Sequence, residues 1–401
     1  MPLLPSHWQI RIPVLVVLPA VLLVCLGWIA MDRCEELCGG AGWHLRQQVI
    51  WSALAAAAML AAATPNYRVL SRWSYPIFAA AIVLLVLVYF LPPVHGARRW
   101  LRFGPVGVQP SELAKIALVL GLARYLMDGE RQRRASGLLI PLGMTLLAVL
   151  LILGEPDLGT AMVLLPVFLV MLFAAGTPRK VLAALAAAGL LALPLLWTGM
   201  SREQKSRVTA LFEQPGPADA VTADTYQLHQ AKQVVALGSV WGSLAVGQAV
   251  DDPDAYHLPE ARSDFIFCIL AERLGLPGAG LVLGLYVVLV WQGLAIAAAS
   301  REPFGRLAAV GLANLIAVQA VINTGMTVGL LPVVGLSLPL VSYGGSGLVC
   351  NGLLVGLLVN IAVRPGYQVT REPFRYVVSS PAAAFGKGRP AIGGRPERPR
   401  S

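Results

Sequence analysis

Long runs of apolar residues, separated by short polar or Gly/Pro-rich breaks, make up most of the chain. Each run is close to the length of about 20 apolar residues with which a helix crosses a bilayer. The ten runs cover approximately residues 12–31, 45–64, 75–92, 110–127, 137–153, 158–176, 181–199, 264–298, 307–331 and 345–363. The eighth run is long enough for a tilted or broken helix, and Gly275 to Gly280 (GLPGAG) is its natural break. The pattern predicts an all-α, polytopic integral membrane protein with about ten transmembrane helices.

The composition agrees with this class of protein. Hydrophobic residues make up 57% and charged residues 13% of the 401 residues, and the mean hydropathy is +0.69. About a quarter of the residues of a soluble globular protein are charged, so an ordinary soluble enzyme is excluded. A wholly disordered chain is excluded as well, because it would need low hydrophobicity and high charge. We expect a transmembrane domain over residues 1–363, followed by a basic, Pro/Gly-rich tail over residues 364–401 that is predicted to be disordered.

The charge balance predicts the orientation. Lys and Arg number 31 against 21 Asp and Glu, which gives a net charge of +10. These cations do not form a stripe interleaved with aromatic residues, so we expect no nucleic-acid partner. Membrane proteins collect Lys and Arg on the cytoplasmic side, and ten spans place both termini on one side. Because the tail carries eight Lys or Arg against two Glu, both termini are expected in the cytoplasm, with the tail close to anionic membrane lipids.

Two connecting segments on the predicted outer face are candidates for function. One covers residues 93–111, and the other, between the seventh and eighth spans, covers about residues 200–263. The second is far longer than a connector needs to be, and binding residues tend to lie on such loops. A third, short loop from Asp32 to Gly40 contains Cys34 and Cys38, which are either bridged or two free thiols.

Several charged residues lie where the pattern places a membrane. Glu112 and Lys115 are three residues apart at the start of the fourth span, so they share a helix face and can pair. Asp157 lies in the turn between the fifth and sixth spans, and Asp264 opens the eighth. A charge in a membrane is costly and usually lines a cavity or pathway. The structural alternatives are an ion pair that only fixes helix packing, and, for the two aspartates, helix caps.

Cations on the outer face favour an anionic ligand. Arg98, Arg99 and Arg102 lie in the first outer loop and Arg207 lies in the second, against the positive-inside tendency. Guanidinium groups bind phosphate through two parallel hydrogen bonds. Trp100 can stack on a sugar or anchor at the membrane interface. Together these residue types indicate a site for a polar, phosphorylated, lipid-borne substrate.

Six strings, in a fixed order and with compatible spacing, carry a family resemblance. They are Arg98-Arg99-Trp100, Gln109 to Lys115 (QPSELAK), Glu155 to Thr160 (EPDLGT), Tyr226-Gln227 with Leu237-Gly238-Ser239, Leu258-Pro259-Glu260 leading to Asp264-Phe265-Ile266-Phe267, and Asn323 with Gly325-Met326 followed by Leu338 to Ser346 (LPLVSYGGS). With these strings the chain resembles the SEDS family (shape, elongation, division and sporulation), whose members include RodA and FtsW. The match runs through most of the membrane region and fades in the first forty residues and in the tail.

The resemblance implies a ten-helix peptidoglycan glycosyltransferase in the bacterial cytoplasmic membrane. Such an enzyme polymerises lipid II, the undecaprenyl-diphosphate-linked disaccharide pentapeptide, and works with a class B penicillin-binding protein that crosslinks the product. Leu331 to Gly335 (LPVVG) and Phe304-Gly305-Arg306 look more like RodA than FtsW, which favours a role in elongation and cell shape over division.

Polymerisation of lipid II needs a base at the attacking sugar hydroxyl and positive charge at the departing diphosphate. Asp264 is the expected general base. The expected substrate-binding residues are Arg98, Arg99, Trp100, Glu112, Lys115, Asp157 and Arg207. A divalent cation, Mg²⁺ or Mn²⁺, that bridges carboxylate and diphosphate is left open.

Two other functions remain open on the sequence. Intramembrane carboxylates and broken helices also suit a lipid II transporter, or flippase. A scaffold that only positions the crosslinking enzyme is the third hypothesis.

Overall fold

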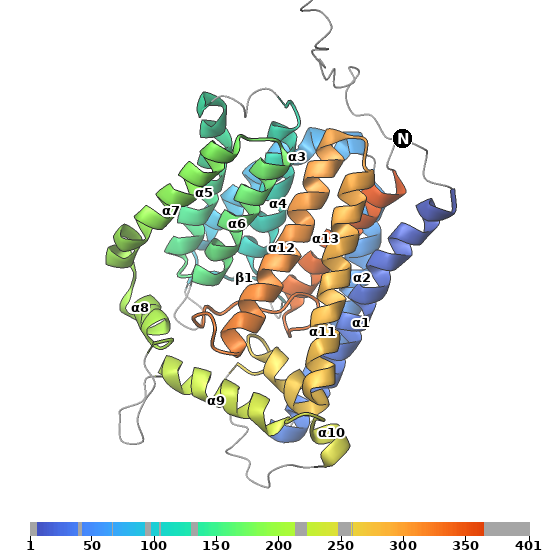
Figure 1. Cartoon of the computed structure of the whole chain (residues 1–401), viewed down its shortest axis with the longest axis vertical. Helices are drawn as coiled ribbons and strands as arrows, with labels where there is room; N and C mark the ends of the chain where they lie inside the picture. The colour runs from blue at the N-terminus through green and yellow to red at the C-terminus, as the bar shows by residue number, and fades with distance from the viewer. Residues whose placement is uncertain are drawn as a thin grey trace, which may run out of the picture.

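The computed structural model of the chain describes residues 6–38, 42–65, 67–92, 98–103, 106–129, 135–212, 223–247, 258 and 260–364. The predicted tail lies outside these residues except for Arg364. The elements in chain order are α1 (Ser6–Cys38), α2 (Trp43–Ala63), α3 (Tyr67–Val88), β1 (Leu101–Phe103), β2 (Val106–Val108), α4 (Pro110–Leu126), η2 (Ala135–Leu138), α5 (Leu139–Gly154), α6 (Leu158–Ala174), α7 (Arg179–Gly199), α8 (Arg202–Thr209), α9 (Ala223–Leu237), α10 (Ser243–Val246), α11 (Ile266–Ala299), α12 (Pro303–Thr327) and α13 (Gly345–Val363). The long helices form a bundle (Figure 1).

The predicted all-α membrane architecture is confirmed. Within the described residues, a helix occupies each of the ten predicted spans. Six helices in this part of the chain (α1, α3, α5, α11, α12 and α13) are long and apolar enough to cross a membrane, and α6 is a shorter apolar helix. Arg364, which follows α13, donates from its guanidinium to the carbonyls of Ala63 and Thr64, where α2 ends. Figure 1 shows that α1 begins at this same end of the bundle. Figure 1 shows α8, α9 and the start of α11 at the opposite end.

The first helix corrects the predicted position of Cys34 and Cys38. Both cysteines were expected in a loop, but they lie in the last two turns of α1, which runs on to Cys38. Residues 32–38 (DRCEELC) contain no Gly or Pro, so nothing interrupts the helix before the Gly39-Gly40 pair.

Arg33, in this added stretch of α1, forms a buried ion pair with Glu272 of α11. Its Nη2 lies 2.9 Å from Oε1 of Glu272, and its Nε donates to Oε2 at 3.2 Å. The Nη1 atom donates to Glu36 at 3.0 Å. A guanidinium that meets a carboxylate at two points compensates the cost of burying both charges. The pair fixes α1 against the first turns of α11.

Two glycines let α13 approach α2 closely. A Cβ on Gly352 would collide with the carbonyl oxygen of Ala55, and one on Gly356 would collide with that of Met59. Glycines four residues apart are a recurrent means of bringing membrane helices together, because van der Waals packing rather than hydrophobicity drives their association. These glycines therefore set the contact between the second and last spans.

The predicted break in the eighth span is confirmed as a kink in α11. Gly275 has φ 66° and ψ −161°, in a region that residues other than glycine rarely adopt. A Cβ at this position would lie 2.5 Å from the amide nitrogen of Gly242, and the Leu276 amide donates to the Val240 carbonyl at 3.1 Å. The segment before α10 thus docks into the kink.

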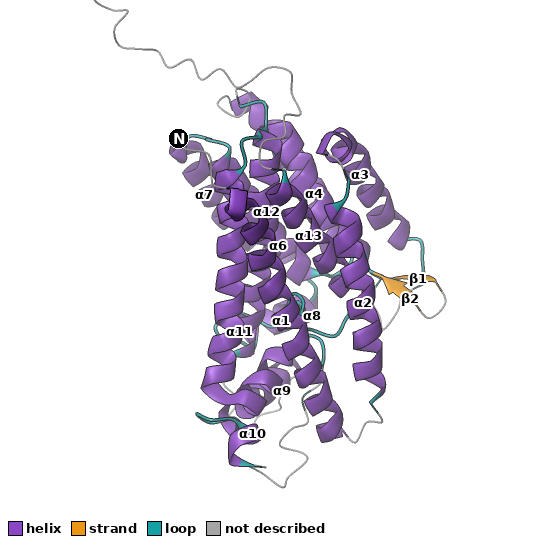
Figure 2. Ribbon diagram, turned by 90° about the vertical axis from the view of Figure 1, so that its right-hand side faces the viewer, coloured by secondary structure: helices purple, strands orange, loops and turns teal. Residues whose placement is uncertain are grey.

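The two long connecting segments contain secondary structure that the pattern did not predict. β1 and β2 form an antiparallel hairpin between α3 and α4, visible at the edge of the bundle in Figure 2. The segment between α7 and α11 carries α8, α9 and α10. Of these short elements, α9 and α10 contact α11, the helix that begins just after Asp264.

The Arg33–Glu272 pair yields a stability prediction. Arg33→Met should lower the free energy of unfolding by about 3–5 kcal/mol, because it leaves a buried carboxylate without its partner. The double variant Arg33→Met/Glu272→Leu should regain most of this loss. Thermal unfolding of the purified protein in detergent measures both, and equal losses in the single and double variants would show that the pair does not compensate buried charge.

Candidate functional site

Residues 334–336, between α12 and α13, lie where several distant segments meet. A Cβ on Gly159, in the first turn of α6, would lie 2.8 Å from the carbonyl oxygen of Val334. One on Gly335, whose φ is +68°, would lie 3.4 Å from Oδ2 of Asp264 and 3.6 Å from Nη1 of Arg207. The carboxylate of Asp264 and the guanidinium of Arg207 therefore border the same small space.

The backbone of Asp264 is tied to α12. The side-chain amide of Asn323 donates to the carbonyl of Asp264 at 2.8 Å and to that of Leu336 at 2.6 Å. Asn323 is fully buried, so these bonds are shielded from competition with water. One amide thus sets the distance between the start of α11 and the 334–336 segment.

The two residues before Asp264 are held from the α12–α13 segment. The hydroxyl of Ser342 donates to the carbonyl of Ser263 at 2.5 Å, and the amide of Tyr343 donates to that of Arg262 at 2.9 Å. We call the three donors, Asn323, Ser342 and Tyr343, the carbonyl clamp. All three donors lie in the motif strings, but the strings alone assign them no role.

The side chain of Asp264 does not cap α11. The residue at the N-cap position is Phe265, and no side chain bonds the first turn there. Burial and the neighbouring carboxylate of Glu260 raise the pKa of Asp264 from 3.8 to about 6, against the opposing effect of Arg99 and Arg207. The result is a carboxylate that is ionised at neutral pH and more basic than an exposed one.

Arg99 connects two carboxylates of the site. Its charge lowers the pKa of both Asp264 and Glu155, so it lies within electrostatic reach of each. Arg98 is turned toward the end of α3, where its Nη1 donates to the carbonyl of Tyr89 at 3.2 Å. The ring of Trp100 packs on the hairpin, because a Cβ on Gly107 would lie 3.2 Å from its Cε3.

Asp157 is the N-cap of α6, as one of the two sequence interpretations expected. Its carboxylate accepts hydrogen bonds from the amide and the hydroxyl of Thr160 at 3.1 and 2.9 Å. Gln109 and Ser111, at the start of α4, also donate to it at 3.0 and 3.3 Å. Four bonds occupy this carboxylate and join α6 to α4.

Glu112 and Lys115 form the predicted pair on α4. The Lys115 Nζ lies 2.7 Å from Oε1 of Glu112, and both side chains are buried. The pair lies in the first two turns of α4, next to Ser111 and the Asp157 cap. The two opposite charges compensate each other where α4 begins.

Glu155 is a buried carboxylate that lies in a motif string and is not among the predicted site residues. It is 0% exposed, and in the described part of the chain neither of its oxygens has a hydrogen-bond partner. Burial, reinforced by the charge of Asp157, raises its pKa from 4.5 to about 8, while Arg99 lowers it. Glu155 therefore carries a proton at neutral pH. An acidic residue in a turn between two apolar runs was the available signal.

Among the described residues, no three of His, Cys, Asp and Glu lie close enough together to hold a metal ion. The arrangement of a basic carboxylate beside two guanidinium groups can accept a proton and stabilise an anion in the same place.

The chain is similar to known proteins over most of its length. A family model described as cell cycle protein, for FtsW, RodA and SpoVE, matches residues 10–366. The probable peptidoglycan glycosyltransferase FtsW of Geobacter metallireducens is 34% identical over 368 residues, which cover 88% of this chain and 95% of that protein. The stage V sporulation protein E of Bacillus subtilis is 32% identical over 323 residues, with 79% and 86% covered.

Solved structures share the fold. A chain from a peptidoglycan synthase complex, described as coordinating polymerization and crosslinking, has a TM-score of 0.73 at 30% identity, with 86% of this chain and 96% of that chain covered. The rod shape determining protein RodA of Thermus thermophilus has a TM-score of 0.65 at 28% identity, with 88% and 97% covered.

The raised pKa of Glu155 predicts a pH-dependent stability. The folded protein keeps this proton up to about pH 8, whereas the unfolded chain loses it near the ordinary value of 4.5. Stability is therefore lost as the pH rises through this window. Glu155→Gln cannot lose a proton, so it should unfold about 5 °C above the wild type at pH 8 and close to it at pH 5.

Thermal unfolding in detergent at both pH values measures this difference. Asp32→Asn, which changes an exposed carboxylate, is the matched control and should shift the midpoint little. The same offset for Glu155→Gln at pH 5 and pH 8 would contradict a buried, protonated Glu155.

Proposed function

This chain belongs to the cell cycle protein family of FtsW, RodA and SpoVE, and on that premise we propose that it is a peptidoglycan glycosyltransferase that polymerises lipid II at Asp264. The names of the relatives support the reaction class. The observation that carries the choice of site is the shared space at Gly335, where the carboxylate of Asp264 faces the guanidinium of Arg207.

In the proposed reaction, Asp264 is the general base. The 4-hydroxyl oxygen of the acceptor sugar attacks the anomeric carbon of the donor, and its proton passes to the Asp264 carboxylate. The bond between the anomeric carbon and the diphosphate breaks, and undecaprenyl diphosphate leaves with the electron pair. Asp264 then releases its proton to water. A positioned base of this kind contributes about 10²–10⁴-fold to the rate.

The cations near Asp264 are proposed to bind the diphosphate. Arg99 and Arg207 both act on the Asp264 carboxylate, so a diphosphate within their reach is also close to the base. Preorganised cations stabilise the charge that develops on the leaving group. Arg98 and Trp100, next to Arg99 in the chain, are proposed to line the approach to this site.

The buried polar residues of α4 and α6 are proposed to shape the floor of the site. Lys115 is held by Glu112, so it presents a positive charge in a fixed position. Asp157 fixes the start of α6 against α4 through Gln109. In this role Glu112, Lys115 and Asp157 affect substrate binding indirectly, because they hold α4 and the start of α6 in position.

We propose that the chain ends are cytoplasmic and that the Asp264 end faces outward. Arg179 and Lys180 open α7, Arg301 precedes α12 and Arg364 follows α13, all at the end of the bundle where α1 begins. This distribution fits the positive-inside rule. The partner is proposed to be a class B penicillin-binding protein, and the synthase complex with a similar fold supports this pairing of activities.

The proposal predicts a selective loss of activity. Asp264→Asn keeps the volume of the side chain but cannot take up a proton as a base, so polymerisation should fall by about 10²–10⁴-fold. The purified variant, with its crosslinking partner, is assayed for glycan chains made from lipid II. Expression, thermal stability and binding of the partner should stay close to the wild type.

Asp128→Asn, which changes an exposed carboxylate just beyond the far end of α4, is the matched control and should keep most of the activity. Normal glycan synthesis by Asp264→Asn would rule out the base. Intact polymerisation combined with lost movement of lipid II across vesicle membranes would instead favour the transporter.

We also propose a role in elongation rather than division, on the strength of the strings Leu331 to Gly335 and Phe304-Gly305-Arg306. Depletion of the protein in its own host should then give rounded cells, because side-wall synthesis stops while division continues. Long filaments without septa would contradict elongation and place the protein with the FtsW-named relatives in division. Cell length and width measured by microscopy decide between the two.

A further inference from the structure

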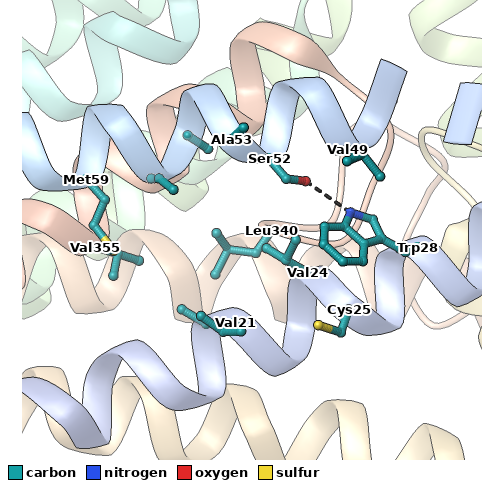
Figure 3. Close-up of a pocket in the computed structure, with 14 residues that line it drawn as sticks. Val21, Val24, Cys25, Trp28, Val49, Ser52, Ala53, Met59, Leu340 and Val355 are labelled. Atoms are coloured by element: carbon teal, nitrogen blue, oxygen red, sulfur yellow. Dashed lines mark hydrogen bonds between the residues drawn. The ribbon is translucent and has the colours of Figure 1, made fainter. Parts of the chain in front are cut away.

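An apolar groove lies between α1 and α2, away from Asp264. It has a volume of about 320 Å³, within the range of ligand pockets. Val21 and Val24 of α1 form one wall, Val49 and Ala53 of α2 form the other, and Val355 of α13 lies at the floor (Figure 3). The small residues of α2 that face α1 leave this space open.

The groove offers no hydrogen bond to a ligand. Its polar side chains, Trp28 and Ser52, are bonded to each other, with the indole Nε1 donating to the hydroxyl at 3.1 Å (Figure 3). The Ser52 hydroxyl in turn donates to the carbonyl of Gln48 at 2.7 Å. A ligand of this groove is therefore held by apolar contacts alone.

Both walls belong to helices of the membrane region, and the groove opens toward the lipid. Val21 is 49% exposed and Val49 is 44% exposed, so the rims face outward rather than into the bundle. The groove runs from Trp28 back to Ala20 along α1, about 12 Å at 1.5 Å per residue. This length and the volume of about 320 Å³ fit part of a single hydrocarbon chain in the leaflet on the side of Asp264.

One charged residue lies beyond the groove on each of its two helices, Arg46 on α2 and Asp32 on α1. Arg46 lies three and seven residues before Val49 and Ala53, and therefore on the same face of α2. Asp32 lies four residues after Trp28, on the corresponding face of α1. Both side chains are exposed, and no ion pair joins them among the described residues.

We propose that this groove binds one acyl chain of a phospholipid with an amino headgroup, such as phosphatidylethanolamine. The phosphate meets Arg46, and the ammonium group meets Asp32. This charge complementarity distinguishes the ligand from phosphatidylglycerol, which lacks a cation for Asp32, and from a polyprenyl phosphate, which also carries none.

The floor of the groove links the lipid to the carbonyl clamp. Leu340 lines the groove and is 5% exposed, and its φ of +66° is unusual for a residue with a side chain. Ser342 and Tyr343 of the clamp follow two and three residues later. A chain that packs on Leu340 therefore stabilises the turn from which the clamp donates to the carbonyls before Asp264.

Photo-crosslinking of the full chain in lipid nanodiscs tests the site. Phosphatidylethanolamine, phosphatidylglycerol and polyprenyl phosphate probes, each with a diazirine on the hydrocarbon chain, are compared by mass spectrometry of the labelled peptides. The phosphatidylethanolamine probe should label residues 20–28 and 49–59 severalfold more than the other two. Stronger labelling by polyprenyl phosphate, or equal labelling by all three, would overturn the proposal.

Matched variants complete the test. Ala53→Phe fills the groove and should reduce the labelling severalfold, whereas Leu54→Phe, on the adjacent lipid-facing position, should leave it unchanged. Asp32→Asn, which leaves the groove unfilled, should remove the preference over phosphatidylglycerol; a preference that survives would overturn the headgroup assignment. Polymerisation of lipid II by the wild type is assayed in parallel. If the phosphatidylethanolamine probe labels the groove but no glycan chains form, the proposed function is contradicted and the lipid site is not.

Discussion

Three consecutive backbone carbonyls before α11 are each bound by a donor from the last third of the chain, and the position of Asp264 depends on these bonds. Asn323 holds the carbonyl of Asp264 itself, and Ser342 and Tyr343 hold the two before it. The carbonyl clamp fixes the backbone where the chain leaves the long segment after α7 and enters the membrane. Its three bonds go to backbone carbonyls, so the carboxylate of Asp264, the proposed proton acceptor, takes no part in the clamp.

Burial of charged groups then sets the pKa of this fixed carboxylate. Removal from water raises the pKa of Asp264 to about 6, and Arg99 and Arg207 keep it from rising further. At neutral pH the group is mostly ionised yet more basic than a solvated aspartate. The same two cations suit a diphosphate, so in the proposed mechanism one arrangement serves both the base and the leaving group. Asp157 differs because four donors occupy its oxygens.

The sequence predicted the fold well because span length and hydropathy are local properties. The ten helices and the kink at Gly275 follow from apolar runs and their breaks. The end of α1 was misjudged because the charge of Arg33 is compensated by a residue more than 200 positions away. For the same reason the clamp donors could be placed in motifs but not assigned a role, since long-range pairing is invisible in one sequence. The proximity of Arg207 to Asp264 could likewise not be predicted, because the two residues are far apart in the chain and meet only in the folded structure.

The pH dependence of kcat/KM for lipid II polymerisation tests the central claim most directly, because it reports the ionisation of the free enzyme. The wild type should gain activity with rising pH through an apparent pKa near 6, the value of Asp264. Arg207→Gln removes a neighbouring positive charge, so the same limb should move to higher pH. A profile that is flat between pH 5 and 7, or a limb that stays in place in Arg207→Gln, would contradict Asp264 as the base beside that guanidinium.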